Sequence, residues 1–208
     1  ELTRRLSGDR RGSRLATIDR TVTGAGARLL AERLSAPLTE PAAIARRLDA
    51  TDFFLGETRL RADLRELLRG APDLERALSR LTLGRGSPRD LAALRDGLAL
   101  TAEIRALAAG AADAPPEEVA AALEDLGQHA EQVDRLARAL KPELPPAARD
   151  GGFIAAGYAA RLDELVRLRD EGRRLIANLE ARYRQEAGVE TLKIKHNNVL
   201  GYFIEVTA

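Results

Sequence analysis

Apolar residues recur at every third or fourth position through most of this sequence, and Gly or Pro separates one such segment from the next. In "GAGARLLAERL", for example, Ala27, Leu30 and Leu34 fall on one face of a helix. Because only 3% of the 208 residues are aromatic, Leu, Ile, Val and Ala must supply most of the buried surface. The pattern predicts a mainly α-helical protein in which several helices are joined by short loops.

Capping residues indicate where these helices begin. Thr23 is the expected N-cap of the first, Pro41 lies in the first turn of the next, and Ser87 is expected to cap a longer one. The stretch before Thr23 is broken by Gly8 and Gly12 and predicts extended or irregular backbone. Other helices are expected in "ETRLRADLRELL", "PDLERALSRLTL", "PPEEVAAALEDL" and "AEQVDRLARAL".

The segment 158–187 predicts one long helix. At about 1.5 Å per residue its length would be about 45 Å, which exceeds the width of the body that the earlier helices can build, so we expect it to project. Oppositely charged residues four apart support it: Asp163 with Arg167, Asp170 with Arg174, and Glu180 with Arg184. An apolar stripe on this helix is expected to be covered by folding back, by a second copy or by a crystal neighbour: Leu162, Val166, Ile176, Leu179 and Tyr183.

The C-terminal segment changes character. "TLKIKH" and "GYFIEV" are β-branched and aromatic, and they flank Asn197-Asn198, a turn pair that tolerates left-handed backbone. We therefore expect a short β-hairpin. Two strands alone are marginal in water, so the remaining strands are expected beyond residue 208. The sequence contains no Met, even at position 1, and is interpreted as a piece of a larger protein.

The sequence contains no recognisable set of catalytic residues. The chain has no Cys, and its two histidines, His129 and His196, lie in different segments without metal-ligand spacing. "GDRRGSR" lacks the Gly-Lys-Ser/Thr of a phosphate-binding loop. We therefore expect no catalytic, cofactor-binding or metal-binding residues in this chain, and no enzyme activity from it. A helical enzyme is the disfavoured reading.

The expected cellular location rests on the lack of a membrane span and of a signal peptide in the sequence. No apolar run approaches the roughly 18 residues of a membrane span, and no signal peptide is visible. The default expectation is a cytoplasmic protein without a membrane partner.

Nucleic-acid contact has two candidate sites. In the expected hairpin, Lys193 and Lys195 alternate with apolar residues and fall on one strand face, and His196, Asn197 and Asn198 crown the turn. Such groups suit contact with DNA phosphates, and the same pattern is typical of a solvated strand, so both interpretations stay open. The second candidate is a basic N-terminal cluster diluted by Asp9 and Glu1: Arg4, Arg5, Arg10, Arg11 and Arg14.

Four segments, in this order, resemble the MutS family of bacterial DNA mismatch-repair proteins: "TIDRTVTGAGARLLAERLSAPL", "DLERALSRLTLGRGSPRDLAALRDGL", "RDGGFIAAGYAARLDELVRL" and "TLKIKHNNVLGYFIEVT". The resemblance covers essentially the whole chain. It implies three parts, namely a helical core at 1–157, a long lever helix at 158–190, and the first strands of an incomplete clamp domain at 191–208.

The resemblance also implies a function. The chain would be a non-catalytic structural fragment of a mismatch-recognising repair ATPase, coupling the ATPase end to the DNA clamp and contacting duplex DNA without sequence preference. ATP, Mg, mismatched double-stranded DNA and a homodimer are then expected of the full-length protein, with no cofactor in this chain. The alternative, reached without the resemblance, is a helical scaffold that binds a partner protein through the long helix.

Overall fold

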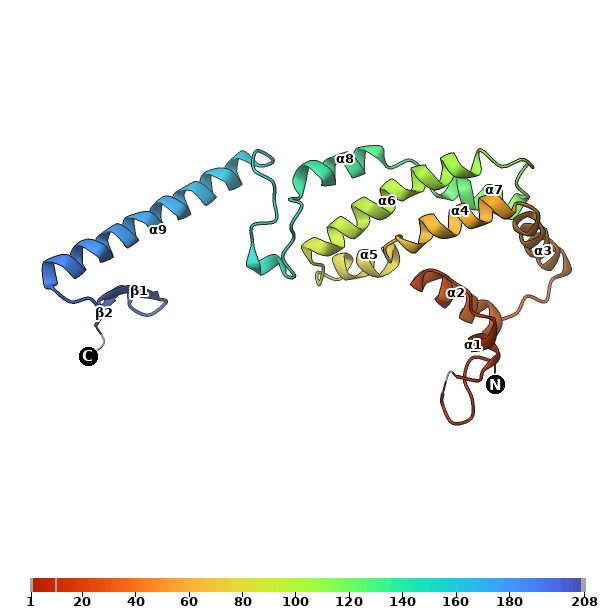
Figure 1. Ribbon diagram of the computed structural model, residues 1–208, viewed down its shortest axis with the longest axis horizontal. Helices are drawn as coiled ribbons and strands as arrows, with labels where there is room; N and C mark the ends of the chain where they lie inside the picture. The colour runs from red at the N-terminus through yellow and green to blue at the C-terminus, as the bar shows by residue number, and fades with distance from the viewer. Residues whose placement is uncertain (1, 10, 207–208) are drawn as a thin grey trace. The chain divides into compact units, whose positions relative to one another are not determined.

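The computed structural model describes residues 2–9 and 11–206 and divides into two compact units, Glu1–Ala155 and Ala156–Ala208 (Figure 1). The mainly helical class with a C-terminal hairpin is confirmed. The first unit holds α1 (Arg14–Ile18), α2 (Gly24–Ser35), α3 (Pro41–Gly56), α4 (Thr58–Arg69), α5 (Leu74–Thr82), α6 (Pro88–Ala108), α7 (Glu117–Asp125), α8 (Ala130–Ala139) and the 3-10 turn η1 (Ala148–Asp150). The second holds α9 (Ala160–Ala187), β1 (Lys193–Asn197) and β2 (Gly201–Glu205).

The short helix α1 corrects one expectation. The stretch before Thr23 was expected to be irregular, but Ser13 begins a helical turn there by accepting a hydrogen bond from the Ala16 N–H at 3.2 Å. Leu15, in this turn, is only 3% exposed. The Ser13 cap and the burial of Leu15 therefore stabilise a helical turn that the sequence pattern alone is too weak to predict.

The expected caps of three longer helices are confirmed. Thr23 accepts from the Gly26 N–H at 2.9 Å, and Pro41 is the first residue of α3. Ser87 and Asp90 form a reciprocal capping box at the start of α6, in which the Asp90 carboxylate accepts from the Ser87 N–H at 2.8 Å. Each cap satisfies backbone N–H groups that the helix itself leaves unpaired.

Helix α6 is the centre of the first unit. It packs against α4, α5 and α8, while α3 packs against α4 and α7; Figure 1 shows α6 running beside α4 and α8. Gly97, in the middle of α6, permits a close approach to α5, because a Cβ there would lie 2.4 Å from Cδ2 of Leu74. The most deeply buried apolar residues of the unit include Leu60, Ala77 and Leu140.

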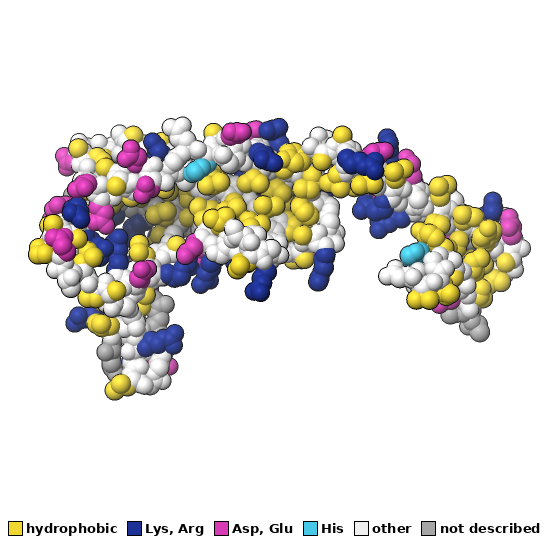
Figure 2. All heavy atoms as spheres, turned by 180° about the vertical axis from the view of Figure 1, so that it is seen from behind, with side chains coloured by type: hydrophobic (Ala, Val, Ile, Leu, Met, Phe, Trp, Pro, Cys, Tyr) yellow, Lys and Arg dark blue, Asp and Glu magenta, His cyan; other side chains and the backbone are white. Residues whose placement is uncertain are grey.

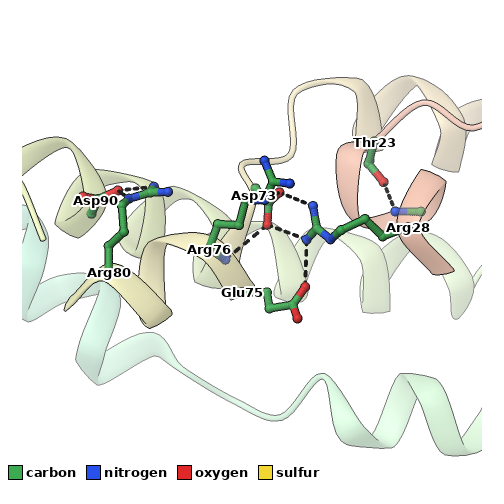
Figure 3. A network of polar contacts seen from close by, with 8 residues as sticks. Thr23, Arg28, Asp73, Glu75, Arg76, Arg80 and Asp90 are labelled. Carbon is green, nitrogen blue, oxygen red and sulfur yellow. Dashed lines mark hydrogen bonds and ion pairs between the residues drawn. The ribbon is translucent and has the colours of Figure 1, made fainter. Parts of the chain in front are cut away.

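Ion pairs join α2 to α5 and α5 to α6 (Figure 3). The Arg28 guanidinium donates to both carboxylate oxygens of Asp73, at 2.7 and 2.9 Å, and to Glu75 at 2.7 Å. Arg80 donates from Nε to Asp90 at 3.0 Å. These hydrogen bonds, from Arg28 and Arg80 respectively, lower the pKa of Asp73 and of Asp90 from 3.8 to about 2.

Acid should therefore weaken the first unit. A carboxyl whose pKa is lower in the folded state contributes its stability fully above the unfolded pKa of 3.8 and loses it as pH falls through the folded pKa of about 2. We expect the urea midpoint of the chain to fall steadily over that window. The Asp73→Asn, Asp90→Asn double variant should show a flatter profile there, and an equally steep one would contradict the assignment.

Within residues 2–9 and 11–206, the structure contains no helix that combines the length and the apolar character needed to cross a membrane.

Candidate nucleic-acid interface

The second unit begins with α9, whose 28 residues extend about 42 Å at 1.5 Å per residue. The expected long helix is confirmed, and Gly188 ends it in the left-handed conformation at φ 67°. Of the three expected charge pairs, Glu180 with Arg184 is present. The carboxylate of Asp163 instead accepts from the N–H of Gly157, in the turn before α9, at 2.9 Å.

The expected apolar stripe on α9 divides into two parts. Leu162 and Val166 are exposed, at 39% and 38%, whereas Ile176, Leu179 and Tyr183 are half-buried. The half-buried part lies on the half of α9 that ends next to the hairpin. Strand β1 packs against α9, which covers this end of the helix in part.

Two charged side chains join the end of α9 to the hairpin. Arg184 forms an ion pair with Glu180 and donates from Nε to the Leu192 carbonyl at 2.7 Å. Glu180 in turn accepts from the Ile194 N–H at 2.8 Å. Leu192 is 5% exposed. Helix and hairpin are thus linked by hydrogen bonds to the backbone, which fix the place where β1 begins.

The strand register places the two lysines on one face. In the antiparallel pair, Lys193 lies opposite Glu205 and Lys195 opposite Phe203, and residues two apart share a face. Both lysines are exposed. They differ in their partners, since Lys195 forms an ion pair with Glu205 and Lys193 has none among the residues that the structure describes. Lys193 is therefore the freer cation.

The turn is built differently from the expected Asn197-Asn198 pair. Asn197 closes β1, and its Oδ1 accepts from the N–H groups of Val199 at 2.9 Å and Leu200 at 2.7 Å. The left-handed residue is Gly201, at φ 70°, and no other type of residue has positive φ in the described part of the chain. The two asparagines therefore do not use the left-handed conformation that they would tolerate, and Gly201, three residues after Asn198, adopts it without a Cβ clash.

His196 lies on the opposite face from the lysines. It pairs with Tyr202 across the strands, and their rings meet edge to face with centroids 4.8 Å apart. Tyr202 is 66% exposed and Val199, in the turn, 91%. The hairpin thus presents a cationic face, an aromatic face and an exposed tip that includes Asn198.

The register brings in two residues that sequence reasoning missed, Glu205 and Tyr202. Each was visible in "GYFIEV", but its cross-strand neighbour depends on the length of the turn. A carboxylate on the lysine face lowers the attraction for phosphate, whereas an exposed tyrosine offers a surface for stacking or packing.

The N-terminal basic cluster lies in the first unit. Its described members are exposed: Arg4, Arg5, Arg11 and Arg14. Arg10, like Glu1, lies outside the described residues. The other histidine, His129, stands at the N-cap position of α8, and its Nε2 lies 3.0 Å from the Leu126 carbonyl at the end of α7.

Among residues 2–9 and 11–206, no three His, Asp or Glu side chains converge as a metal site would require.

Comparison with known proteins gives a consistent result. The family model described as MutS domain III matches residues 1–195. Proteins named DNA mismatch repair protein MutS are similar over the whole chain: 56% identical in Nitrobacter winogradskyi, 57% in Rhodopseudomonas palustris strain BisA53, and 56% in Bradyrhizobium sp. strain ORS 278. The chain spans 23% of the length of each of these relatives.

Proposed function

Because the chain belongs to the MutS domain III family, we propose that it is a non-catalytic helical part of a mismatch-recognising DNA repair ATPase. In this proposal the complete protein binds mismatched double-stranded DNA as a homodimer and uses ATP with Mg outside this chain. The chain divides into the helical core at 1–157, the lever helix at 158–190 and the start of the clamp at 191–208, of which residues 207–208 lie outside the described structure.

The proposed mechanical role is to couple the ATPase end to the DNA clamp. It is supported by the joint between α9 and the hairpin. Because the Ile194 N–H and the Leu192 carbonyl are both held by side chains of α9, a rotation of the helix would carry β1 with it. A helix of 28 residues is long enough to carry such a rotation over tens of ångströms.

The proposed DNA contact is through the hairpin, with Lys193, Lys195, His196, Asn197 and Asn198 as candidates. The single observation that carries it is the exposed cation Lys193, which lies beside an exposed turn and has no ion-pair partner within residues 2–9 and 11–206. Lys195 would have to leave Glu205 to reach a phosphate, and Asn197 already uses its Oδ1 in the turn. Contacts to phosphates give position without sequence preference.

Substitution of the two lysines tests this contact. We expect Lys193→Ala to weaken duplex binding by the complete gene product several-fold, and Lys195→Ala to weaken it less, because Lys195 is ion-paired. Glu205→Gln should strengthen binding, since it removes a carboxylate from the same face. Fluorescence anisotropy with a labelled duplex gives the affinities.

Lys141 provides the matched control for the loss of one positive charge. It is the chain's other lysine, and it is exposed in the loop after α8 in the first unit. Lys141→Ala should leave the affinity unchanged. The proposed contact would be rejected if Lys141→Ala and Lys193→Ala weakened binding equally.

A second candidate function is a helical scaffold that binds a partner protein through α9. It is favoured by three exposed leucines of this helix, Leu165 at 48%, Leu168 at 53% and Leu175 at 64%. If this were the main role, Leu168→Arg would abolish partner capture while Lys193→Ala had no effect on DNA affinity.

A further inference from the structure

An apolar groove lies in the first unit where α2, α3, α4 and α7 meet. It encloses about 600 Å³, and its lining includes Phe54, Leu64, Leu68, Val119 and Leu123. Most of these side chains are only half-buried in the chain as it stands. Figure 2 shows Lys and Arg side chains gathered around a hollow in the part of the first unit drawn at the left.

The groove continues along α3. A second hollow of about 310 Å³ shares Arg47 and Glu118 with the first and reaches Leu38 and Ala43. The α3 residues that line the combined groove run from Ala43 to Leu55, which are 12 residue steps apart, or about 18 Å at 1.5 Å per residue. We name this surface the α3–α7 groove. Its length matches about three turns of a helix.

The charges on the groove are mainly positive. Four arginines and two glutamates line it: Arg33, Arg46, Arg47, Arg61, Glu117 and Glu118. Arg33 is paired with Glu118 at 3.3 Å, and Arg61 donates to the Phe54 carbonyl at 2.7 Å. With four arginines against two glutamates, the lining of the groove keeps an excess of two positive charges.

Arg47 differs in its hydrogen bonding from Arg33 and Arg61, the other two arginines that line the apolar part of the groove. Its Nε is buried and has no hydrogen-bond partner in the described part of the chain. Buried donors of this kind are rare in folded proteins and are destabilising unless an acceptor is supplied. Arg47 lines both hollows, so an occupant of the groove could bring an acceptor to it.

We propose that the α3–α7 groove binds an acidic amphipathic helix of a partner protein. Apolar side chains of such a helix would occupy the groove between Phe54 and Leu123, and a carboxylate would accept from Arg47. This is the helix-in-groove mode of recognition, in which apolar anchors supply affinity and flanking charge supplies orientation. The inference uses the first unit alone and is independent of the proposed DNA contact.

The test measures binding of a synthetic probe to the complete gene product. The probe is a fluorescein-labelled amphipathic peptide of about 12 residues, the length that spans about 18 Å as a helix, with Leu on one face and Glu on the other. We expect saturable binding in fluorescence polarisation, weakened about tenfold by Arg47→Ala because a charge-assisted hydrogen bond is lost. The same peptide with Gln in place of Glu should bind about as weakly.

Two further variants separate binding from folding. Ala122→Trp places a bulky side chain on an exposed position of the groove wall, and it should block the peptide while the thermal melting curve stays unchanged. Arg89→Ala removes an exposed arginine of α6 that does not line the groove, and binding should stay at the wild-type level.

Three results would overturn the inference. One is equal affinity for the Arg47→Ala and Arg89→Ala variants. Another is binding by the 208-residue chain with none by the complete gene product, which would mean that the protein's own polypeptide fills the groove. The third is a concentration-dependent dimer that Ala122→Trp disrupts, which would identify a second copy as the occupant.

Discussion

Replacement of Asp90 by Ala is expected to lower the free energy of unfolding of the first unit by about 2–4 kcal/mol. Asp90 is 6% exposed and performs two tasks at once. It completes the capping box with Ser87 at the start of α6 and accepts from Arg80 in the preceding helix. Alanine leaves the Ser87 N–H without its side-chain acceptor and the guanidinium of Arg80 without its partner. Urea denaturation followed by circular dichroism measures the loss.

Asp96 is the control for this substitution. It lies in the same helix, its side chain is 58% exposed, and its one ion pair in the described part of the chain is with the adjacent Arg95. Exposed pairs of this kind contribute little, so Asp96→Ala should change stability by less than about 0.5 kcal/mol. A loss for Asp90→Ala no larger than that for Asp96→Ala would show that the capping box and ion pair do not stabilise α6.

Replacement of Gly97 by Val is expected to destabilise the same unit by about 2–3 kcal/mol, because extra atoms would be forced into a closed packing contact. A Cβ at Gly97 would lie 2.4 Å from Cδ2 and 2.7 Å from Cγ of Leu74. The opposing gain in helix propensity is only a few tenths of a kcal/mol, since Val ranks modestly above Gly. Relief requires the Leu74 side chain to move out of its packed position. Thermal melting measures the effect, and Gly97→Ala should fall between the wild type and Gly97→Val.

Gly56 provides a glycine of the same unit without this contact. It is the last residue of α3, and a Cβ there would meet no atom within 4 Å. Gly56→Val should be nearly neutral. If both glycine variants melted at the same temperature, close packing between α5 and α6 would not be the reason for glycine at position 97.

Local signals in the sequence were sufficient for most helix boundaries. Thr23 and Ser87 act as caps through their own side chains and the next few backbone N–H groups, so nothing distant is needed to predict them. The helix α1 was missed because its stabilising feature, the burial of Leu15, depends on residues outside the turn. The contact between Gly97 and Leu74 is likewise tertiary and has no signature in the sequence.

In the candidate interface, too, local features could be predicted from the sequence and contacts between strands could not. Alternation alone placed Lys193 and Lys195 on one face, and the register agrees. The difference in ion pairing between the two lysines could not be foreseen, because it depends on the contact of Glu205 with Lys195 across the strands. That pairing follows from a turn that ends at a left-handed Gly201. Which residue of the turn adopts the left-handed conformation depends on the whole hairpin.

The most direct measurement of the proposed DNA contact is the salt dependence of duplex binding by the complete gene product. Each phosphate contact contributes about 0.9 to the slope of log K against log salt concentration. With Lys193→Ala we expect the slope to become shallower by about that amount, while Lys141→Ala keeps the wild-type slope. Equal slopes for the wild type, Lys193→Ala and Lys141→Ala would contradict phosphate contact by the hairpin.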